Sequence, residues 1–263
     1  MRRAPAGWRD LGAGLPVHII EHRYKEVTME SFAPLENCPD ANRMLGRLLA
    51  SLEEDRACLS RELHDEMGGL LGSVIMDIEF VEKHMPLDVL PKQRLTRARG
   101  VLANAIALER KMLEALRPSI LDNFGLFEAI RWEVKRQCQR AQIECIENYP
   151  GAQPVFNPES AIGLFRIAQE SHRVALRQPG VTITHMTVSI ARGMLDIAVS
   201  HDGEEGAAGN LLEDDLFAIC FIAHRARFLG GRTMVENIRE GGASYRAILP
   251  LSRLVTTRTQ AAV

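Results

Sequence analysis

The chain has 263 residues, of which 46% are hydrophobic and 25% are charged, which suits one large globular domain or two of moderate size. Lysine and arginine total 32 against 34 aspartate and glutamate residues, so the formal net charge of −2 excludes a global electrostatic attraction to nucleic acid or membrane. We therefore expect no nucleic-acid partner.

The cysteine pattern and the hydropathy of the sequence indicate in which cellular compartment the protein resides. The five cysteines are scattered and form no CxxC pair: Cys38, Cys58, Cys138, Cys145 and Cys220. This pattern argues against a disulfide framework or structural zinc and favours a reducing compartment. The longest apolar run, residues 216–223, is far shorter than the roughly 20 residues that cross a bilayer. We expect a cytoplasmic protein without membrane insertion.

Residues 1–38 show no hydrophobic period and contain several glycines and prolines, so we expect a poorly ordered leader, with Met1 and Met29 both open as translation starts. From residue 42 to 85, apolar residues recur at spacings of three and four. That period predicts one long helix with an apolar stripe. The stripe consists of Leu45, Leu48, Leu52, Leu59, Leu63, Met67, Leu70, Val74, Ile78, Val81 and Met85.

A second amphipathic helix is predicted over residues 92–116, after Pro86 and Pro91 interrupt the first. One face of it carries Leu95, Leu102, Ile106, Leu113 and Leu116. Two such helices joined by a short loop form an antiparallel hairpin, and a single hairpin leaves its stripe half covered. We therefore expect residues 39–120 to pair with a second copy in a four-helix bundle, which makes the protein a homodimer.

Alternating elements follow Pro118 and predict an α/β sandwich over residues 121–253, with a tail at 254–263. Helices are expected at 126–142, 159–177 and 212–229, and strands at 143–147, 182–190, 194–200, 233–238 and 244–249. The expected fold class is thus α + α/β, a helical hairpin followed by the sandwich.

His64 is the first candidate for chemistry. It lies one residue beyond the stripe position Leu63, which rotates it about 100° from the seam onto the flank of the bundle. Gly68 lies one turn further along this flank, where no side chain obstructs a docking partner. Asp65 is a candidate to orient the imidazole and favour the tautomer with a free nucleophilic nitrogen. The alternative for a lone helical histidine is a solvated polar residue beside the core.

The surrounding residues 61–69 (RELHDEMGG) resemble the H-box R-E-L-H-D-x-x-G of the two-component sensor histidine kinases that pair with DNA-binding response regulators of the nitrate-response type. Further marks of that family follow in matching order: 116–122 (LRPSILD), 165–170 (FRIAQE), 224–226 (HRA) and 229–231 (LGG). The resemblance covers about residues 45 to 251. It implies a dimeric four-helix bundle, then a histidine-kinase-type ATPase sandwich, with His64 as the phosphoacceptor.

The same resemblance implies partners. A response-regulator receiver domain would dock over Arg61, Gly68 and Leu71, and a separate histidine kinase is a further possible phosphoryl donor. Family members that dephosphorylate their regulator carry a glutamine five residues after the histidine. Gly69 stands at that position, so we do not expect dephosphorylation.

The resemblance fails where ATP and magnesium should bind. In the family, a magnesium-binding asparagine follows the position of Glu170 by four residues, and Val174 stands there, with no oxygen to offer a hard cation. Arg177 keeps the basic position of this asparagine box. The metal ligand is therefore missing from the sequence.

Both glycine boxes are altered as well. His201 replaces the aspartate that accepts from the adenine amino group, while Asp202 and Gly203 follow it. Glu205 replaces a glycine and adds negative charge where phosphates would approach. Residues 216–222 contain no glycine to let backbone N–H groups face a triphosphate. We expect a degenerate sandwich that binds neither ATP nor magnesium, and no autokinase activity.

Other candidate sites have simpler explanations. His185 and His201 could both lie on strands, but no cluster of carboxylates or cysteines accompanies the pair, so we expect no metal site, and Cys220 suits a small core residue. Four basic residues on one helix indicate a solvated face, since no aromatic residues alternate with them. These are Arg131, Lys135, Arg136 and Arg140.

Three functions therefore remain. In the favoured one, the chain is a phosphorelay protein whose His64 exchanges a phosphoryl group with an aspartate of a receiver domain. The alternatives are an active ATP-dependent sensor histidine kinase and a non-catalytic dimeric scaffold that binds a kinase or regulator. Nucleotide binding distinguishes the kinase, and phosphoryl acceptance by His64 distinguishes the relay from the scaffold.

Overall fold

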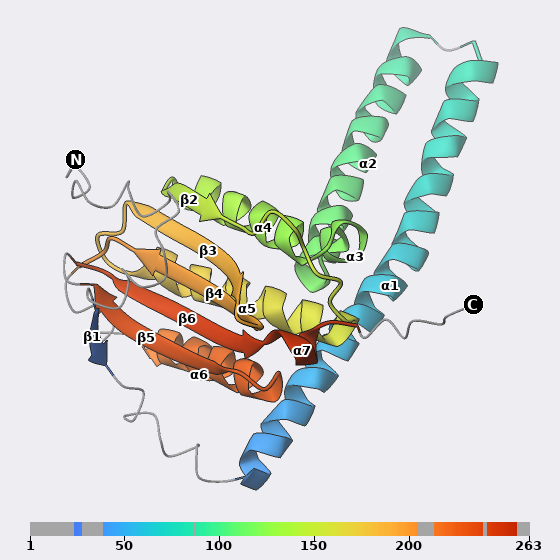
Figure 1. Cartoon of the computed structure of the whole chain (residues 1–263). Coiled ribbons are helices and arrows are strands. Elements are labelled where there is room, and N and C mark those ends of the chain that lie inside the picture. Colours follow the sequence, from blue (N-terminus) through green and yellow to red (C-terminus); the bar gives the residue numbers. More distant parts are fainter. Residues whose placement is uncertain (1–23, 28–38, 87, 205–212, 239–240, 257–263) are drawn as a thin grey trace. The chain divides into compact units, whose positions relative to one another are not determined.

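The computed structural model describes residues 24–27, 39–86, 88–204, 213–238 and 241–256. Two compact units make up the chain (Figure 1). One unit is Arg47–Ser119, a helical hairpin, and the other combines Met1–Gly46 with Ile120–Val263 and contains the sheet. Among the described residues, no helix has the length and apolarity needed to span a bilayer.

The hairpin consists of α1 (Pro39–His84) and α2 (Val89–Leu116), which confirms both predicted helices. Helix α2 ends where the Arg117 N–H donates to the Leu113 carbonyl, just before Pro118, which has no N–H with which to continue the helix. Near the tip, Arg99 of α2 and Glu82 of α1 form an ion pair of 3.4 Å.

The apolar stripe of α1 is only partly covered within one chain. Ile78 is buried, whereas Leu63, Met67 and Val81 are half-buried. Six stripe residues within this unit leave more than two-fifths of their surface exposed, namely Leu48, Leu52, Leu59, Leu70, Val74 and Met85. One hairpin therefore buries about half of its own stripe, as the sequence predicts.

The second unit is built on a six-stranded mixed sheet in the order β1-β5-β6-β4-β3-β2. Its strands are β1 (Tyr24–Val27), β2 (Glu144–Asn148), β3 (Ile183–Ala191), β4 (Met194–His201), β5 (Arg232–Ile238) and β6 (Ala243–Pro250). Only β2 and β3 pair in parallel, and the other described pairs are antiparallel. Three helices cover one face of this sheet, namely α4 (Leu126–Ala141), α5 (Pro158–Arg177) and α6 (Glu213–Phe228) (Figure 1).

The core lies between these helices and the sheet. Alternate residues of β4 and β6 are buried, so that Leu195, Ile197 and Leu249 meet Leu164 and Phe165 of α5 in one apolar cluster. Helix α5 begins at Asn157, whose side chain accepts from the Ser160 N–H, with Pro158 in the first turn. The expected α/β sandwich is confirmed.

Three short elements were not predicted, namely β1, α3 (Ser119–Phe124) and α7 (Leu251–Leu254). Strand β1 lies within the expected leader and pairs with β5, Tyr24 opposite Ile238, so its partner lies near the other end of the chain. Local period cannot reveal such a pairing. The rest of the leader and Glu205 lie outside the described residues.

The expectation of no disulfide was wrong. Cys138 at the end of α4 and Cys145 on β2 are disulfide-bonded, whereas Cys58 and Cys220 are free. Gln142 ends α4 in the left-handed conformation, with φ of 56°, and turns the chain back into β2. This reversal leaves the Cα atoms of Cys138 and Cys145 6.4 Å apart.

Candidate functional site

His64 lies on α1 with its side chain exposed to solvent. Within the part of the chain that the structure describes, the imidazole makes no hydrogen bond. A histidine on a helix flank with an accessible ring has the geometry that a phosphoryl acceptor requires, because an incoming phosphorus must reach a ring nitrogen directly.

A carboxylate from the other helix of the hairpin lies beside Gly68, one turn after this histidine. Glu109 of α2 is only 4% exposed. A Cβ atom placed on Gly68 would lie 3.5 Å from Oε1 of Glu109 and 3.9 Å from Nδ1 of His64. The missing side chain of Gly68 thus leaves room for Glu109 and for the Nδ1 edge of the imidazole.

Sequence analysis did not identify Glu109, although the sequence contains a signal for it. The apolar face of α2 includes Leu102, Ile106 and Leu113, and Glu109 falls three residues after Ile106 and four before Leu113. Glu109 therefore occupies a position of the apolar seam, where a buried carboxylate is uncommon and calls for a specific reason.

Asp65, the predicted orienting residue, makes no hydrogen bond with His64 among the described residues. Adjacent residues on a helix point about 100° apart, so Asp65 faces away from the imidazole. Arg61 is exposed and Leu71 is half-buried, one turn before and about two turns after His64. Arg61, Gly68 and Leu71 thus lie along the same helix as His64, as their spacing requires.

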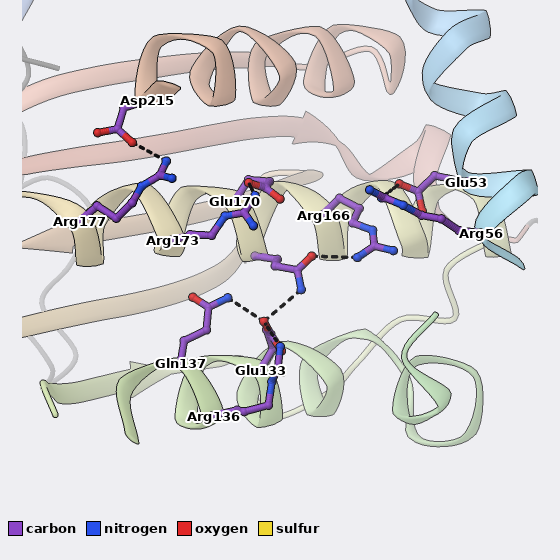
Figure 2. Close-up of polar contacts among 11 residues, drawn as sticks. Glu53, Arg56, Glu133, Arg136, Gln137, Arg166, Glu170, Arg173, Arg177 and Asp215 are labelled. Atoms are coloured by element: carbon purple, nitrogen blue, oxygen red, sulfur yellow. Dashed lines mark hydrogen bonds and ion pairs between the residues drawn. The ribbon is translucent and has the colours of Figure 1, made fainter. Parts of the chain in front are cut away.

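In the α/β unit, the counterparts of the asparagine box are already bonded to other residues of the chain. Val174 is fully buried on α5. Arg177 forms an ion pair with the buried Asp215 of α6 (Figure 2), and Gln178 Nε2 donates to the same carboxylate at 3.0 Å. Glu170 forms an ion pair with Arg173 one turn away. Helix α5 therefore presents no free metal-binding oxygen at the position of Val174.

His201, at the end of β4, is fully buried beside Tyr245, with ring centroids 5.9 Å apart. Burial lowers the pKa of His201 to about 4, although the carboxylate of Asp202 acts in the opposite direction. The neutral ring accepts from the Gly203 N–H at Nδ1, 3.1 Å away, so Nε2 carries the proton. The ring thus offers an N–H donor where the family's aspartate offers an acceptor to the adenine amino group, which is itself a donor.

The two residues after His201 are also hydrogen-bonded or closely packed within the α/β unit. Asp202 accepts from the backbone N–H groups of Thr182 and Ile183, at 2.8 and 2.9 Å, and from the Thr182 hydroxyl. A Cβ atom on Gly203 would lie 2.9 Å from His201 Nδ1 and 3.0 Å from the Pro179 carbonyl oxygen, so this glycine is closely enclosed. Neither residue is available to a ligand in this arrangement.

The segment expected to hold the second glycine box is part of α6. Ile219 and Ile222 are buried in the core, and Phe217 is 58% exposed. A regular helix has its N–H groups bonded internally beyond the first turn, so it cannot supply the open backbone that cradles phosphates.

The basic face of α4 is partly neutralised. Arg131 pairs with Glu128 and lies over the Tyr149 ring, 4.7 Å from its centroid. Arg136 pairs with Glu133 at 2.6 Å. Two of the four basic residues on this helix are thus paired within the chain.

Comparison with known proteins identifies relatives of the hairpin and of the whole chain. The family described as Histidine kinase (HisKA_3) matches residues 55–121. The chain is 27% identical over 222 residues to the sensor histidine kinase MctS of Rhizobium johnstonii, an alignment that covers 82% of this chain and 48% of that protein. It is 22% identical to the oxygen sensor histidine kinase NreB of Staphylococcus carnosus, with 80% of this chain and 60% of that protein covered.

A third relative is the sensor protein NarQ homolog of Haemophilus influenzae, 21% identical over 270 residues, covering 93% of this chain and 47% of that protein. The chain thus spans about half the length of the curated relatives it matches. The matched hairpin region contains His64, Gly68 and Glu109.

Proposed function

Because the chain belongs to the nitrate-type family of two-component sensor histidine kinases, we propose that it is a phosphorelay protein whose His64 exchanges a phosphoryl group with an aspartate of a response-regulator receiver domain. One observation carries the proposal. The imidazole of His64 is exposed and unbonded, whereas the residues at the nucleotide positions of the α/β unit are bonded to each other.

The chemistry of this transfer requires little from the chain. Nε2 of His64 attacks the phosphorus of the receiver's aspartyl phosphate, an N–P bond forms, and the P–O bond breaks to release the aspartate carboxylate. The proton on Nδ1 stays in place, and the Glu109 carboxylate and the Nδ1 edge of the ring both lie next to Gly68. The receiver domain supplies the magnesium ion and most of the charge stabilisation of the transferring group.

The proposal includes loss of ATP-dependent autophosphorylation. Val174 offers no metal ligand, His201 presents a donor in place of an acceptor, and α6 replaces the phosphate-binding loop. These three changes affect the contacts to the metal ion, to the adenine and to the phosphates. Together they support the proposal that the α/β unit no longer binds ATP with magnesium.

The proposal also includes a homodimer through the hairpin. The exposed stripe residues of α1 are joined by exposed apolar residues of α2, including Val101, Leu108 and Met112. A second copy of the hairpin offers the matching surface, and four-helix packing of two hairpins is the arrangement that covers both stripes.

Transfer from phosphorylated receiver domains tests the function. The full chain is incubated with a panel of labelled phospho-receivers, and in parallel with labelled ATP and magnesium. We expect acid-labile, base-stable label on the wild-type chain from at least one receiver and none from ATP, and no label on His64→Gln. Label from ATP would support the kinase alternative. Absence of label from every receiver that binds the chain would support the scaffold alternative.

A further inference from the structure

Two cysteine sulfurs and one imidazole meet inside the α/β unit. They belong to Cys138 at the end of α4, Cys145 on β2 and His172 on α5, and their sulfur and nitrogen atoms lie within 4.8 Å of one another. Nε2 of His172 is 3.6 Å from the sulfur of Cys138 and 3.9 Å from that of Cys145. The hydroxyl of Thr184 on β3 lies 3.1 Å from the same Nε2.

The cluster is well shielded from solvent. His172 is 0% exposed, Thr184 1% and Cys138 5%, and Cys145 is half-buried. Four polar or reactive groups from four different elements therefore meet in a region that otherwise contains core residues. A disulfide alone does not require a buried histidine, so the presence of His172 needs a separate explanation.

The orientation of the His172 ring is fixed by a chain of hydrogen bonds. Glu133, 3% exposed, is paired with Arg136 and accepts from Gln137 Nε2 at 2.7 Å (Figure 2). Gln137 Oε1 is thereby left to accept from Nδ1 of His172 at 2.9 Å. Because Nδ1 carries the proton, the lone pair of Nε2 faces the two sulfurs and the Thr184 hydroxyl. This is the outer support that metal-binding histidines use.

We propose that, in the reduced protein, Cys138, Cys145 and His172 bind one zinc ion, with the Thr184 hydroxyl at the fourth position. Tetrahedral zinc with bonds of about 2.3 Å to sulfur and about 2.0 Å to nitrogen separates its sulfur and nitrogen ligands by roughly 3.5 Å. The observed sulfur–nitrogen distances of 3.6 and 3.9 Å are close to that value. Only the two sulfurs, which are bonded to each other here, have to move apart.

Charge selects zinc over other thiophilic ions. Two thiolates, a neutral imidazole and a neutral hydroxyl carry a charge of −2, which one Zn²⁺ balances within a buried site. Cu⁺ would leave an uncompensated negative charge in the core, which is unfavourable. Hard cations such as Mg²⁺ and Ca²⁺ prefer oxygen ligands and would not select sulfur.

Two steps connect the disulfide to the zinc site. A phosphine reductant and water convert the disulfide to two thiols and give the phosphine oxide. Zinc then replaces the two thiol protons, which are released to solvent. The bound ion joins α4, β2, α5 and β3, so it should stabilise the α/β unit whether or not His64 carries a phosphoryl group.

Cobalt binding to the reduced full chain tests the site, because tetrahedral cobalt–thiolate centres absorb in the near ultraviolet and the visible. Metal-free protein is reduced with the phosphine without oxygen and titrated with Co²⁺, then with Zn²⁺. We expect one equivalent of cobalt to bind, zinc to displace it, and zinc to raise the thermal unfolding midpoint. Cys138→Ser, Cys145→Ser and His172→Gln should lose the absorption, whereas the Cys58→Ser, Cys220→Ser double variant should retain it.

A reduced, folded wild-type chain that shows no thiolate–cobalt absorption would overturn the proposal and leave the cysteines with a disulfide role alone. Absorption that persists in Cys138→Ser and Cys145→Ser would overturn it as well. If the single variants do not fold, the test rests on the wild type and the double variant at the two free cysteines. Each should bind one cobalt ion per chain with thiolate absorption, and loss of that absorption in the double variant would overturn the proposal.

Discussion

The flank of α1 around His64 and the region of the α/β unit where the family resemblance places the nucleotide differ in how far their side chains are already bonded. The imidazole of His64 is exposed and makes no hydrogen bond, and Gly68, one turn further on, has no side chain to obstruct access to it. In the α/β unit Arg177 is paired with Asp215, and His201 is bonded to Gly203. The difference shows that His64 remains accessible in a chain whose residues at the expected nucleotide positions are bonded to other residues of the same unit.

The first prediction concerns the exposed apolar stripe of α1, the helix that carries His64. Leu70→Glu should prevent dimerisation, because Leu70 is 67% exposed in one chain and lies on the stripe. Burial of a leucine contributes about 2 kcal/mol and a dimer contains two copies, so the dissociation constant should rise about a thousandfold or more.

Light scattering over a concentration series measures this change. Glu79→Lys, at an exposed position on the side of α1 opposite Leu70, is the control and should remain dimeric. A wild-type chain that is a stable monomer would contradict the account of the hairpin.

The second prediction concerns Glu109. Glu109→Gln keeps the size of the side chain but removes the buried negative charge beside Gly68, next to which Nδ1 of His64 also lies. By analogy with carboxylates that support metal-binding histidines, phosphotransfer should slow by about tenfold to a hundredfold. Receiver affinity should not change, because Glu109 is buried and cannot contact the receiver.

Single-turnover transfer from a phospho-receiver measures the rate, and titration measures the affinity. Glu79→Gln, an exposed carboxylate on α1, serves as the control and should transfer at the wild-type rate. If Glu109→Gln transfers equally fast, Glu109 has only a packing role.

The third prediction concerns pH and the α/β unit. Burial lowers the pKa of His172 and of His201 to about 4, compared with about 6.5 in the unfolded chain. The unfolded chain therefore binds more protons between these values, so the unfolding free energy should decrease as pH falls from about 6.5 to about 4.

In His201→Asn the decrease in unfolding free energy between about pH 6.5 and pH 4 should be smaller by on the order of 2 kcal/mol. The asparagine oxygen can still accept from the Gly203 N–H, but the side chain does not titrate. Urea unfolding at a series of pH values gives the slope. An unchanged slope in His201→Asn would show that His201 titrates normally in the folded chain.

The sequence predicted the elements whose information is local. The three-and-four spacing of the α1 stripe and the alternation in β3 and β4 are periods of a helix and of strands, and both appear as expected. The position of His64 on the flank followed from its one-residue offset from Leu63.

Features that depend on tertiary pairing were missed. Strand β1 requires β5, and the Cys138–Cys145–His172 cluster requires the turn at Gln142 and the packing of α5 on β3. Glu109 was missed for another reason, since an isolated carboxylate in an apolar seam does not reveal which residue it faces across the hairpin. The sequence shows what has been replaced at the nucleotide positions, and the structure shows which contacts fill them.

The most direct test of this contrast is calorimetric titration of the full chain with ATP and magnesium. We predict no saturable heat up to about 1 mM nucleotide, because Val174 offers no metal ligand and His201 offers the wrong hydrogen-bonding group. Magnesium-dependent binding with a dissociation constant in the micromolar range would contradict the account, and it would make the chain an ATP-dependent kinase with unusual nucleotide contacts.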